Sequence, residues 1–272
     1  MAGHDRPQHM RKLNVIGAEI SVTSYEEVVH LVGHWLSGSA SAGENRAKYI
    51  CVTSVHGIVT ARQDPEFRRV LNGADVATPD GMPVVWALRS FGANGQQRVY
   101  GPTLMLRLCE AAAECGQRVF LYGGLPEVLP ALCEQLHHKY PELMIVGTYS
   151  PPFRRLTVTE DESVKRRIRD SGADLVFVGI STPKQENWMA AHQWDFPGKV
   201  LVGVGAAFDF HAKRVRQASA WMQRAGLEWF FRLLMEPARL WRRYLFVTPQ
   251  FLPLWALQKM GILMYDDSNK SA

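Results

Sequence analysis

A repeated unit constrains the fold of this chain more than any other feature of its sequence. In each unit a short, mostly apolar run leads through a turn rich in glycine or proline into a segment with helical spacing. The six runs are KYICVTS, DVATPDG, RVYGP, RVFLYGG, DLVFVGI and KVLVGVG, which begin at residues 48, 75, 98, 118, 174 and 199. Near-continuous apolar strands, each followed by a helix, are typical of parallel sheets covered on both faces. The sequence therefore predicts an α/β fold with a Rossmann-like, mainly parallel sheet and helices on both faces.

The remaining segments extend this plan. Residues 13–22 alternate in a way that predicts a hairpin, and Ser24 is expected to cap a helix that ends near Trp35. The polar stretch 37–47 predicts a flexible surface loop. With 272 residues, of which 47% are apolar, the chain can bury a sizeable core. We expect a body of two closely joined lobes over residues 1–225 and a C-terminal helical appendage over residues 226–272.

Cysteine usage and the N-terminus favour a cytoplasmic protein. The four cysteines, Cys51, Cys109, Cys115 and Cys133, form no CxxC pair, which favours a reducing compartment. The N-terminal stretch is polar, and no apolar run of the signal-peptide type follows it. No window reaches the ~18 apolar residues that a membrane-spanning helix needs.

The loops that follow the predicted strands are the expected binding site. In open α/β sheets, ligands bind beyond the carboxyl ends of the strands. The loops concerned are 53–56, 79–81, 101–103, 122–124, 179–185 and 203–209. In the second of them, Asp80 of TPDG could act as a general base, although Pro-Asp-Gly is also an ordinary turn and aspartate an ordinary helix cap.

Two glycine-rich turns and one polar helix start could address a phosphate or a sugar. The backbone of LYGG (121–124) and VGVG (202–205) could approach a diphosphate, but the same glycines would equally allow tight packing between strand and helix. Lys184 and Gln185 of STPKQENW could bind phosphate and sugar hydroxyls, or could be exposed first-turn residues. No GKS or GKT triplet follows a glycine-rich turn, which argues against a Walker ATPase.

The sequence predicts no metal site and no cofactor. His30 and His34 are spaced for one helical face but have no third ligand at the expected spacing, and neither HExxH nor Asp-x-Asp occurs. A reaction that expels a diphosphate would then need another source of positive charge.

The C-terminal segment is both basic and aromatic. Residues 212–243 contain eight lysines and arginines but only two glutamates, in a chain of net charge +5. Arg232, Arg239 and Arg242 would share one helical face if Pro237 begins a helix in register, and arginine forks bind phosphate oxygens well. The neighbouring tryptophans and phenylalanines suit a membrane surface, which would make this a membrane-associating appendage. Nucleic acid would accept the same composition, and a solvated basic face is the simplest alternative.

Several motifs together resemble the WecG/TagA/CpsF family of bacterial glycosyltransferases. They are TPDG, RVYG, YGG, STPKQE, VGVGAAFDF and GLEWFFRLLMEPARLWRRYL, and the similarity runs from about Leu13 to about Leu252. The resemblance implies inverting, metal-independent transfer of a hexosyl-type sugar from a UDP-sugar to a polyprenyl-diphosphate-linked saccharide. The reaction would occur at the inner leaflet of the cytoplasmic membrane, with the enzyme peripherally associated, in the synthesis of exopolysaccharide, capsule or cell-wall polymer.

The resemblance also implies roles for individual residues. Asp80 would deprotonate the acceptor hydroxyl, Thr53, Arg98 and Gln185 would line the active site, and the tail arginines would bind the diphosphate. With the strand-end loops added, the expected substrate-binding residues are Gly101, Tyr122, Gly123, Gly124, Gly179, Lys184, Gly203, Gly205, Phe208, Asp209, Arg232, Arg239 and Arg242.

Some positions depart from the family pattern. Val55 stands where asparagine is common, and Thr103 where aspartate is common. Lys213 and Ser219 fall in the stretch after FDF, which differs from the residues usual in the family. These changes bear on the donor sugar and on loop geometry. Three alternatives stay open: a non-catalytic membrane- or nucleic-acid-binding protein with a degenerate Rossmann body, a nicotinamide oxidoreductase, and exposed aromatics that bury in a homo-oligomer.

Overall fold

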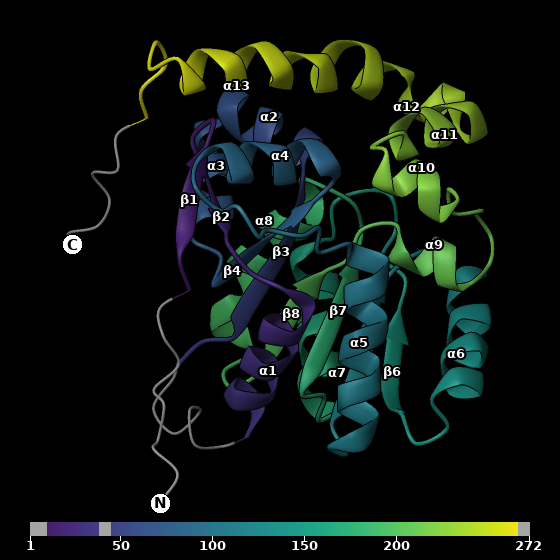
Figure 1. The fold of residues 1–272 in the computed structure, drawn as a ribbon. Coiled ribbons are helices and arrows are strands. Elements are labelled where there is room, and N and C mark those ends of the chain that lie inside the picture. Colours follow the sequence, from purple (N-terminus) through teal and green to yellow (C-terminus); the bar gives the residue numbers. More distant parts are fainter. Residues whose placement is uncertain (1–9, 38–44, 266–272) are drawn as a thin grey trace, which may run out of the picture.

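A parallel sheet forms the centre of the molecule. In the computed structural model, which describes residues 10–37 and 45–265, six strands form this sheet in the order β4-β3-β8-β7-β5-β6, and every neighbouring pair is parallel (Figure 1). The strands are β3 (Lys48–Ser54), β4 (Val76–Asp80), β5 (Arg118–Gly123), β6 (Met144–Tyr149), β7 (Leu175–Gly179) and β8 (Val200–Gly203). The predicted α/β class and parallel sheet are therefore confirmed.

Helices cover both faces of the sheet, as the apolar strands predict. The body contains α1 (Tyr25–Leu36), α2 (Val55–Gln63), α3 (Pro65–Asn72), α4 (Met82–Ser90), α5 (Gly101–Glu114), α6 (Val128–Lys139), α7 (Val158–Asp170), α8 (Lys184–His192), the short 3-10 turn η1 (Gln193–Asp195) and α9 (Ala207–His211). Helix α1 begins with the expected cap, because Ser24 and Glu27 form a reciprocal capping box. The predicted hairpin is also present as β1 (Lys12–Val15) and β2 (Ala18–Ser21).

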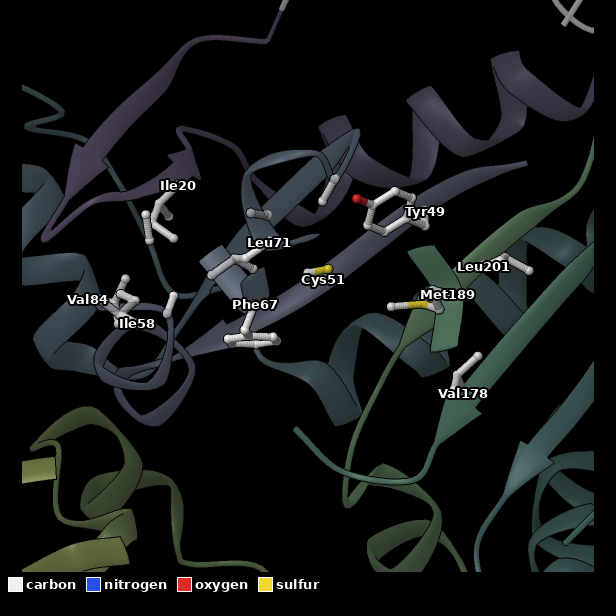
Figure 2. Close-up of a cluster of buried hydrophobic side chains, with 14 of the residues drawn as sticks. Ile20, Tyr49, Cys51, Ile58, Phe67, Leu71, Val84, Val178, Met189 and Leu201 are labelled. Atoms are coloured by element: carbon white, nitrogen blue, oxygen red, sulfur yellow. The ribbon is translucent and has the colours of Figure 1, made fainter. Parts of the chain in front are cut away.

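Side chains that alternate along each strand divide the core into two layers. Tyr49 and Cys51 of β3 face a layer formed with α2, α3, α4, α7, α8 and the hairpin, part of which Figure 2 shows. Ile50 and Val52 face the opposite layer, which is formed with α1, α5, α6 and α9. Because successive residues of a strand point to opposite faces, a strand buried on both sides must be apolar throughout.

The prediction of a strand at RVYGP was wrong. Residues 96–100 have no strand conformation, and the chain makes one sheet-like contact there, in which Val99 N donates to Pro79 O at 3.0 Å. Helix α5 begins at Gly101, so too few residues remain for a ladder. Conversely, β6 and α7 have no counterpart among the predicted elements, since β6 is an edge strand with partly exposed side chains. Of the predicted loop at 37–47, residues 38–44 lie outside the described part.

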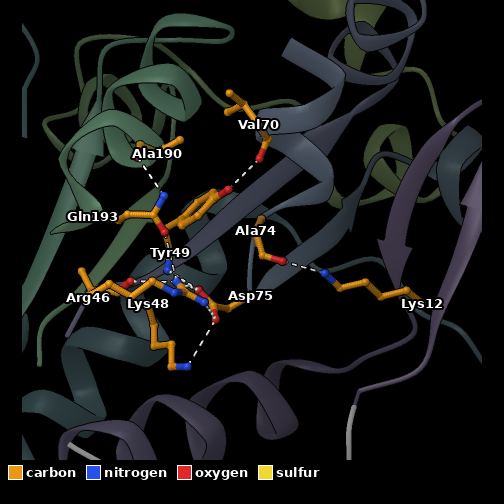
Figure 3. A network of polar contacts seen from close by, with 10 residues as sticks. Lys12, Arg46, Lys48, Tyr49, Val70, Ala74, Asp75, Ala190 and Gln193 are labelled. Atoms are coloured by element: carbon orange, nitrogen blue, oxygen red, sulfur yellow. Dashed lines mark hydrogen bonds and ion pairs between the residues drawn. The ribbon is translucent and has the colours of Figure 1, made fainter. Parts of the chain in front are cut away.

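A polar network fixes the amino ends of β3 and β4, away from the expected site (Figure 3). Asp75 accepts hydrogen bonds from the guanidinium of Arg46 at 2.7 and 2.9 Å and from the backbone N–H of Tyr49 at 2.9 Å. Lys48 adds a second cation at 3.5 Å. This carboxylate is saturated by structural partners, which distinguishes it from a carboxylate at the other end of the strands.

The C-terminal segment is helical and packs on the body. It contains α10 (Ala220–Arg224), α11 (Glu228–Met235), α12 (Pro237–Arg242), the π-helical turn η2 (Arg243–Val247), the 3-10 turn η3 (Thr248–Gln250) and α13 (Phe251–Lys259). Figure 1 shows α13 lying across α2 at one end of the molecule. Phe251 is 1% exposed and belongs to the core layer shown in Figure 2. Gln258 hydrogen-bonds to Ile16 and Asn14 in the hairpin. The division at residue 225 stays a prediction.

We expect Gly123→Ala to destabilise the fold by about 3 kcal/mol or more, because a methyl group there overpacks the core and strains the backbone. Gly123 has a φ of +125°, and an added Cβ would lie 2.5 Å from the carbonyl oxygen of Gly179 on the neighbouring strand. Gly33→Ala in α1 is the control, because its Cβ would meet nothing within 4 Å. That substitution should stabilise by about 0.5–1 kcal/mol through helix propensity. Urea unfolding measures both, and equal effects would contradict the packing argument.

Candidate active site

The site begins at the carboxyl end of β4, where the strand places Asp80 next to Arg98. Asp80 is the last residue of the strand, and Gly81, with a φ of +100°, turns the chain into α4. The Nε and Nη2 groups of Arg98 both donate to Asp80 Oδ1, at 2.9 and 2.8 Å. The two side chains are 18% and 15% exposed, so the pair lies near the surface but is largely screened from solvent. The structure thus brings together two of the four residues predicted to be catalytic.

Arg98 has a second carboxylate partner from the C-terminal segment. Its Nη1 lies 2.7 Å from Oε2 of Glu228, the first residue of α11, and its face lies 4.0 Å from the centroid of the Tyr100 ring. Burial opposes the charge of Arg98, but Asp80 and Glu228 outweigh this effect and hold its pKa above the ordinary value. The Arg98 guanidinium therefore stays cationic while it contacts both carboxylates.

Gln185 and Thr53 lie at the ends of the neighbouring strands. Gln185 is 1% exposed; its Oε1 accepts from Gly205 N at 3.0 Å, and its Nε2 donates to Glu186 Oε1 at 3.1 Å. The oxygen of this amide thus ties α8 to the turn after β8, while its nitrogen bonds to the next residue within α8. Thr53 is buried beside Pro79 of β4, and its hydroxyl donates to Cys51 O at 3.3 Å. Their predicted roles toward substrate stay predictions.

The glycines at the strand ends allow close packing. Gly124 N donates to Gly179 O at 3.0 Å, and a Cβ on Gly179 would lie 2.9 Å from the ring of Phe208. A Cβ on Gly203 would lie 2.8 Å from Met189, and one on Gly101 would lie 3.2 Å from Val52. The packing interpretation explains these contacts without a ligand. Contact of the glycine backbone with substrate stays a prediction.

The other expected binding residues differ in how far they are accessible. Phe208 is almost completely buried, and Tyr122 stacks on Trp188 with ring centroids 4.3 Å apart. Lys184 is exposed at the first turn of α8. Asp209 lies at the start of α9, 3.8 Å from Arg214, and Gly205 has a left-handed φ of +57°. Exposure alone favours Lys184 and Asp209 over the two aromatic side chains as contacts for a ligand.

The tail arginines do not share one environment. The guanidinium of Arg232 lies 5.5 Å from the Phe210 ring at α9, whereas Arg242 is exposed beside the ring of Trp241. The side chain of Arg239 lies outside the described part. Arg243 reaches the end of β3, where its Nη2 donates to Ser54 Oγ at 3.3 Å. Ser54 lies opposite Asp80 in the strand register, so Arg243 brings a cation to the Asp80 edge of the sheet.

Four residues of this region were missing from the sequence prediction: Arg243, Glu228, His56 and Glu186. Arg243 and Glu228 belong to the run that carries the family resemblance, but spacing alone does not show which tail residue faces the body. Glu186 follows Gln185 directly and is 2% exposed, and its Oε1 accepts from Thr182 at 2.8 Å. Burial raises the pKa of this carboxyl. The motif STPKQE places this glutamate directly after Gln185, and that adjacency is the signal by which the sequence could have identified it.

His56, in the first turn of α2, should make stability depend on pH. Burial lowers its pKa to about 4, and the charge of Arg243 adds to the shift. The folded state therefore excludes a proton that the unfolded state binds below pH ~6.5, so stability is lost as pH falls from there toward the folded pKa. We expect the free energy of unfolding to fall by about 2 kcal/mol more in the wild type than in His56→Gln between pH 7.5 and 5. Urea titrations at both pH values measure this difference. An equal change in the free energy of unfolding in the wild type and in His56→Gln would contradict it.

The described part of the chain offers neither a metal-binding cluster nor a membrane-spanning helix. Within residues 10–37 and 45–265, no group of three or more histidines, cysteines, aspartates or glutamates is placed to hold a metal ion. Over the same residues, no helix is both long and apolar enough to cross a membrane.

A parallel sheet with polar side chains gathered at the carboxyl ends of its strands has the layout in which α/β proteins bind their ligands. Comparison with known proteins gives the particular class: residues 13–263 match the glycosyl transferase WecG/TagA/CpsF family, and the chain belongs to that family. It is a glycosyltransferase, and the resemblance seen in the motifs is confirmed.

Two relatives bear the name N-acetylglucosaminyldiphosphoundecaprenol N-acetyl-beta-D-mannosaminyltransferase. The one from Bacillus spizizenii (strain W23) is 34% identical over 202 residues, which cover 74% of this chain and 76% of the relative. The one from Bacillus subtilis (strain 168) is 30% identical over 210 residues, which cover 77% and 80%. The non-catalytic alternative and the nicotinamide oxidoreductase are therefore set aside.

Proposed function

We propose that this glycosyltransferase moves a hexosyl-type sugar from a UDP-sugar to a saccharide linked to a polyprenyl diphosphate, with inversion and without a metal ion. The observation that carries the proposal is the Asp80 carboxylate at the carboxyl end of β4, held by Arg98 and approached by the C-terminal segment. The relatives named above transfer N-acetylmannosamine to a lipid-linked N-acetylglucosamine, which makes these two sugars the first to test.

The geometry supports a single displacement with Asp80 as the base. Among the described residues, the hydrogen bonds to the Asp80 carboxylate all go to Oδ1. Oδ2 is therefore the oxygen that can accept the proton of an acceptor hydroxyl. As the acceptor hydroxyl gives its proton to Oδ2, the acceptor oxygen attacks the anomeric carbon, the bond from that carbon to the UDP oxygen breaks, and UDP leaves with the bonding pair.

Cationic side chains of the C-terminal segment are proposed to stabilise the departing diphosphate. Arg243 already lies at the end of β3, and Arg232 lies over α9. Guanidinium groups form charge-assisted, often bidentate hydrogen bonds with phosphate oxygens. They would supply the positive charge that a divalent ion supplies in other transferases. Arg239 and Arg242 are proposed to join them when substrate is bound.

We also propose peripheral contact with the inner leaflet of the cytoplasmic membrane, where a polyprenyl-linked acceptor resides. The C-terminal segment exposes large apolar side chains, namely Trp221, Leu234, Trp241, Leu245, Phe246 and Leu252. Apolar and aromatic groups interspersed with arginines suit the interface of an anionic bilayer. Sedimentation with anionic vesicles tests this contact, and a homodimer in solution that masks the same residues would argue against it.

The proposed reaction is tested by supplying a labelled UDP-sugar and a prenyl-diphosphate N-acetylglucosamine acceptor, with and without EDTA. We expect a lipid-linked disaccharide at similar rates in both conditions. Comparing UDP-N-acetylmannosamine with UDP-N-acetylglucosamine and UDP-glucose identifies the donor. The proposal fails if none of these donors gives a product, and its metal independence fails if EDTA stops the reaction.

A further inference from the structure

Glu228 is the place where the C-terminal segment touches the Asp80–Arg98 pair. Its Oε2 lies 2.7 Å from Arg98 Nη1, and its side chain is 13% exposed. One guanidinium therefore holds a carboxylate of the body on one side and a carboxylate of the C-terminal segment on the other. Two donors of the planar guanidinium hydrogen-bond to Asp80, and its third nitrogen forms an ion pair with Glu228, so the group is drawn toward a carboxylate on each side.

The backbone next to Glu228 is seated against the turn that follows Asp80. Gly226 has a φ of +74°, and a Cβ added there would lie 3.3 Å from the Trp86 ring and 3.5 Å from Met82 Cβ. Met82 begins α4 just after Asp80 and Gly81. The start of α11 thus rests on α4 directly behind the base, which fixes where the Glu228 carboxylate lies.

Charge balance does not account for a glutamate at this position. Arg98 and Asp80 already neutralise each other, so Glu228 adds a second, largely buried negative charge beside the first. Like charges close together cost free energy unless a shared cation binds both. Arg98 is that cation, and one face of its guanidinium lies over the Tyr100 ring. The arrangement makes the position of Arg98 depend on whether the C-terminal segment is docked.

We propose that Glu228 is a positioning residue that links docking of the C-terminal segment to the orientation of Asp80 through Arg98. The inference rests on the proposed function in taking Asp80 as the base. When Glu228 is in place, Arg98 holds Asp80 Oδ1 and leaves Oδ2 directed to the acceptor. When the segment leaves, Arg98 loses one of its two carboxylate partners, so its guanidinium can turn and the Asp80 carboxylate can turn with it.

The experiment compares Glu228→Gln, Glu228→Asp and the control Glu66→Gln in the transfer assay. Glu66 is a matched carboxylate, since it also pairs with an arginine, Arg69, but it is exposed and lies on α3. We expect kcat to fall about 10- to 100-fold in Glu228→Gln with little change in KM, because the base is misoriented while binding groups remain. Glu228→Asp should recover part of the rate, and Glu66→Gln should behave like the wild type.

A double variant separates positioning from a merely structural role, and an exchange measurement shows whether Glu228 holds the segment in place. Placing Glu228→Gln in an Arg98→Lys background should lower kcat by no more than about twofold beyond Arg98→Lys alone, since residues that act through one another are not additive. Deuterium exchange over residues 226–243 should rise in Glu228→Gln and not in Glu66→Gln. An unchanged kcat, or the same fold loss in both backgrounds, would overturn the proposal.

The positioning role of Glu228 and the proposed function can fail independently of each other. If the wild type transfers no sugar, the proposed function fails, while the exchange measurement still decides whether Glu228 holds the segment in place. If the wild type is active and Glu228→Gln matches it in both rate and exchange, only the positioning role fails.

Discussion

Asp80→Asn is expected to reduce the rate of sugar transfer by about 10²- to 10⁴-fold, the range over which a positioned general base contributes. Asparagine has nearly the same shape, and its amide oxygen can still accept from Arg98 where Asp80 Oδ1 now does, at 2.8 and 2.9 Å. It has no charge and cannot take the proton of the acceptor hydroxyl. The loss should therefore appear in kcat.

The measurement combines initial rates with binding of UDP by calorimetry. Donor binding in Asp80→Asn should stay within about threefold of the wild type, because a base that acts on the acceptor adds little to ground-state binding of the donor. The exposed Glu66→Gln again serves as the control. A variant that keeps more than a tenth of the wild-type rate would remove Asp80 from the role of base.

Ending the chain at residue 225 is expected to abolish transfer and to lower the free energy of unfolding by at least about 3 kcal/mol, the cost of losing one buried phenylalanine. Phe251 is the residue concerned, and the Trp255 indole N–H also donates to Ser90 at 3.0 Å. The deletion further removes Glu228 and Arg243 from the site. Activity and stability should thus fall together.

A chain that ends at residue 265 is the control, because it keeps every contact of the C-terminal segment described above. We expect it to match the wild type in urea unfolding and in transfer rate. Phe251→Ala tests the stability effect alone, since it retains the glutamate and the arginines. The argument for the segment fails if the chain ending at 225 still transfers sugar at a rate near that of the wild type.

The sequence predicted the sheet well because its signal is local. A strand buried on both faces needs apolar residues throughout, and a helix cap needs particular side chains three residues apart, so both can be seen in short windows. The runs at 48, 75, 118, 174 and 199 became β3, β4, β5, β7 and β8, and Ser24 caps α1 as expected. RVYGP failed because a strand also needs a partner along several residues, which a window of five does not reveal.

Asp80 and Arg98 show how much of the candidate site the sequence contains. Each could be proposed from its motif, and the position of Asp80 at a strand end follows from the α/β plan. Their contact could not be derived from the pattern, since Arg98 lies in an irregular segment eighteen residues further on. The same holds for Gln185, where the motif identifies the residue and the structure shows its amide bonded to Gly205.

The sequence by itself determined the fold class and the family and indicated the edge of the sheet for the candidate site, because periodicity and motifs depend on neighbours along the chain. Only the tertiary structure decided which residues of the C-terminal segment meet the site. Rotation about a helix axis changes by about 100° from one residue to the next, so Arg242 and Arg243 are equivalent in composition but face different surroundings. Packing of Gly226 against Met82 and Trp86 seats the start of α11, and this brings Glu228 to Arg98.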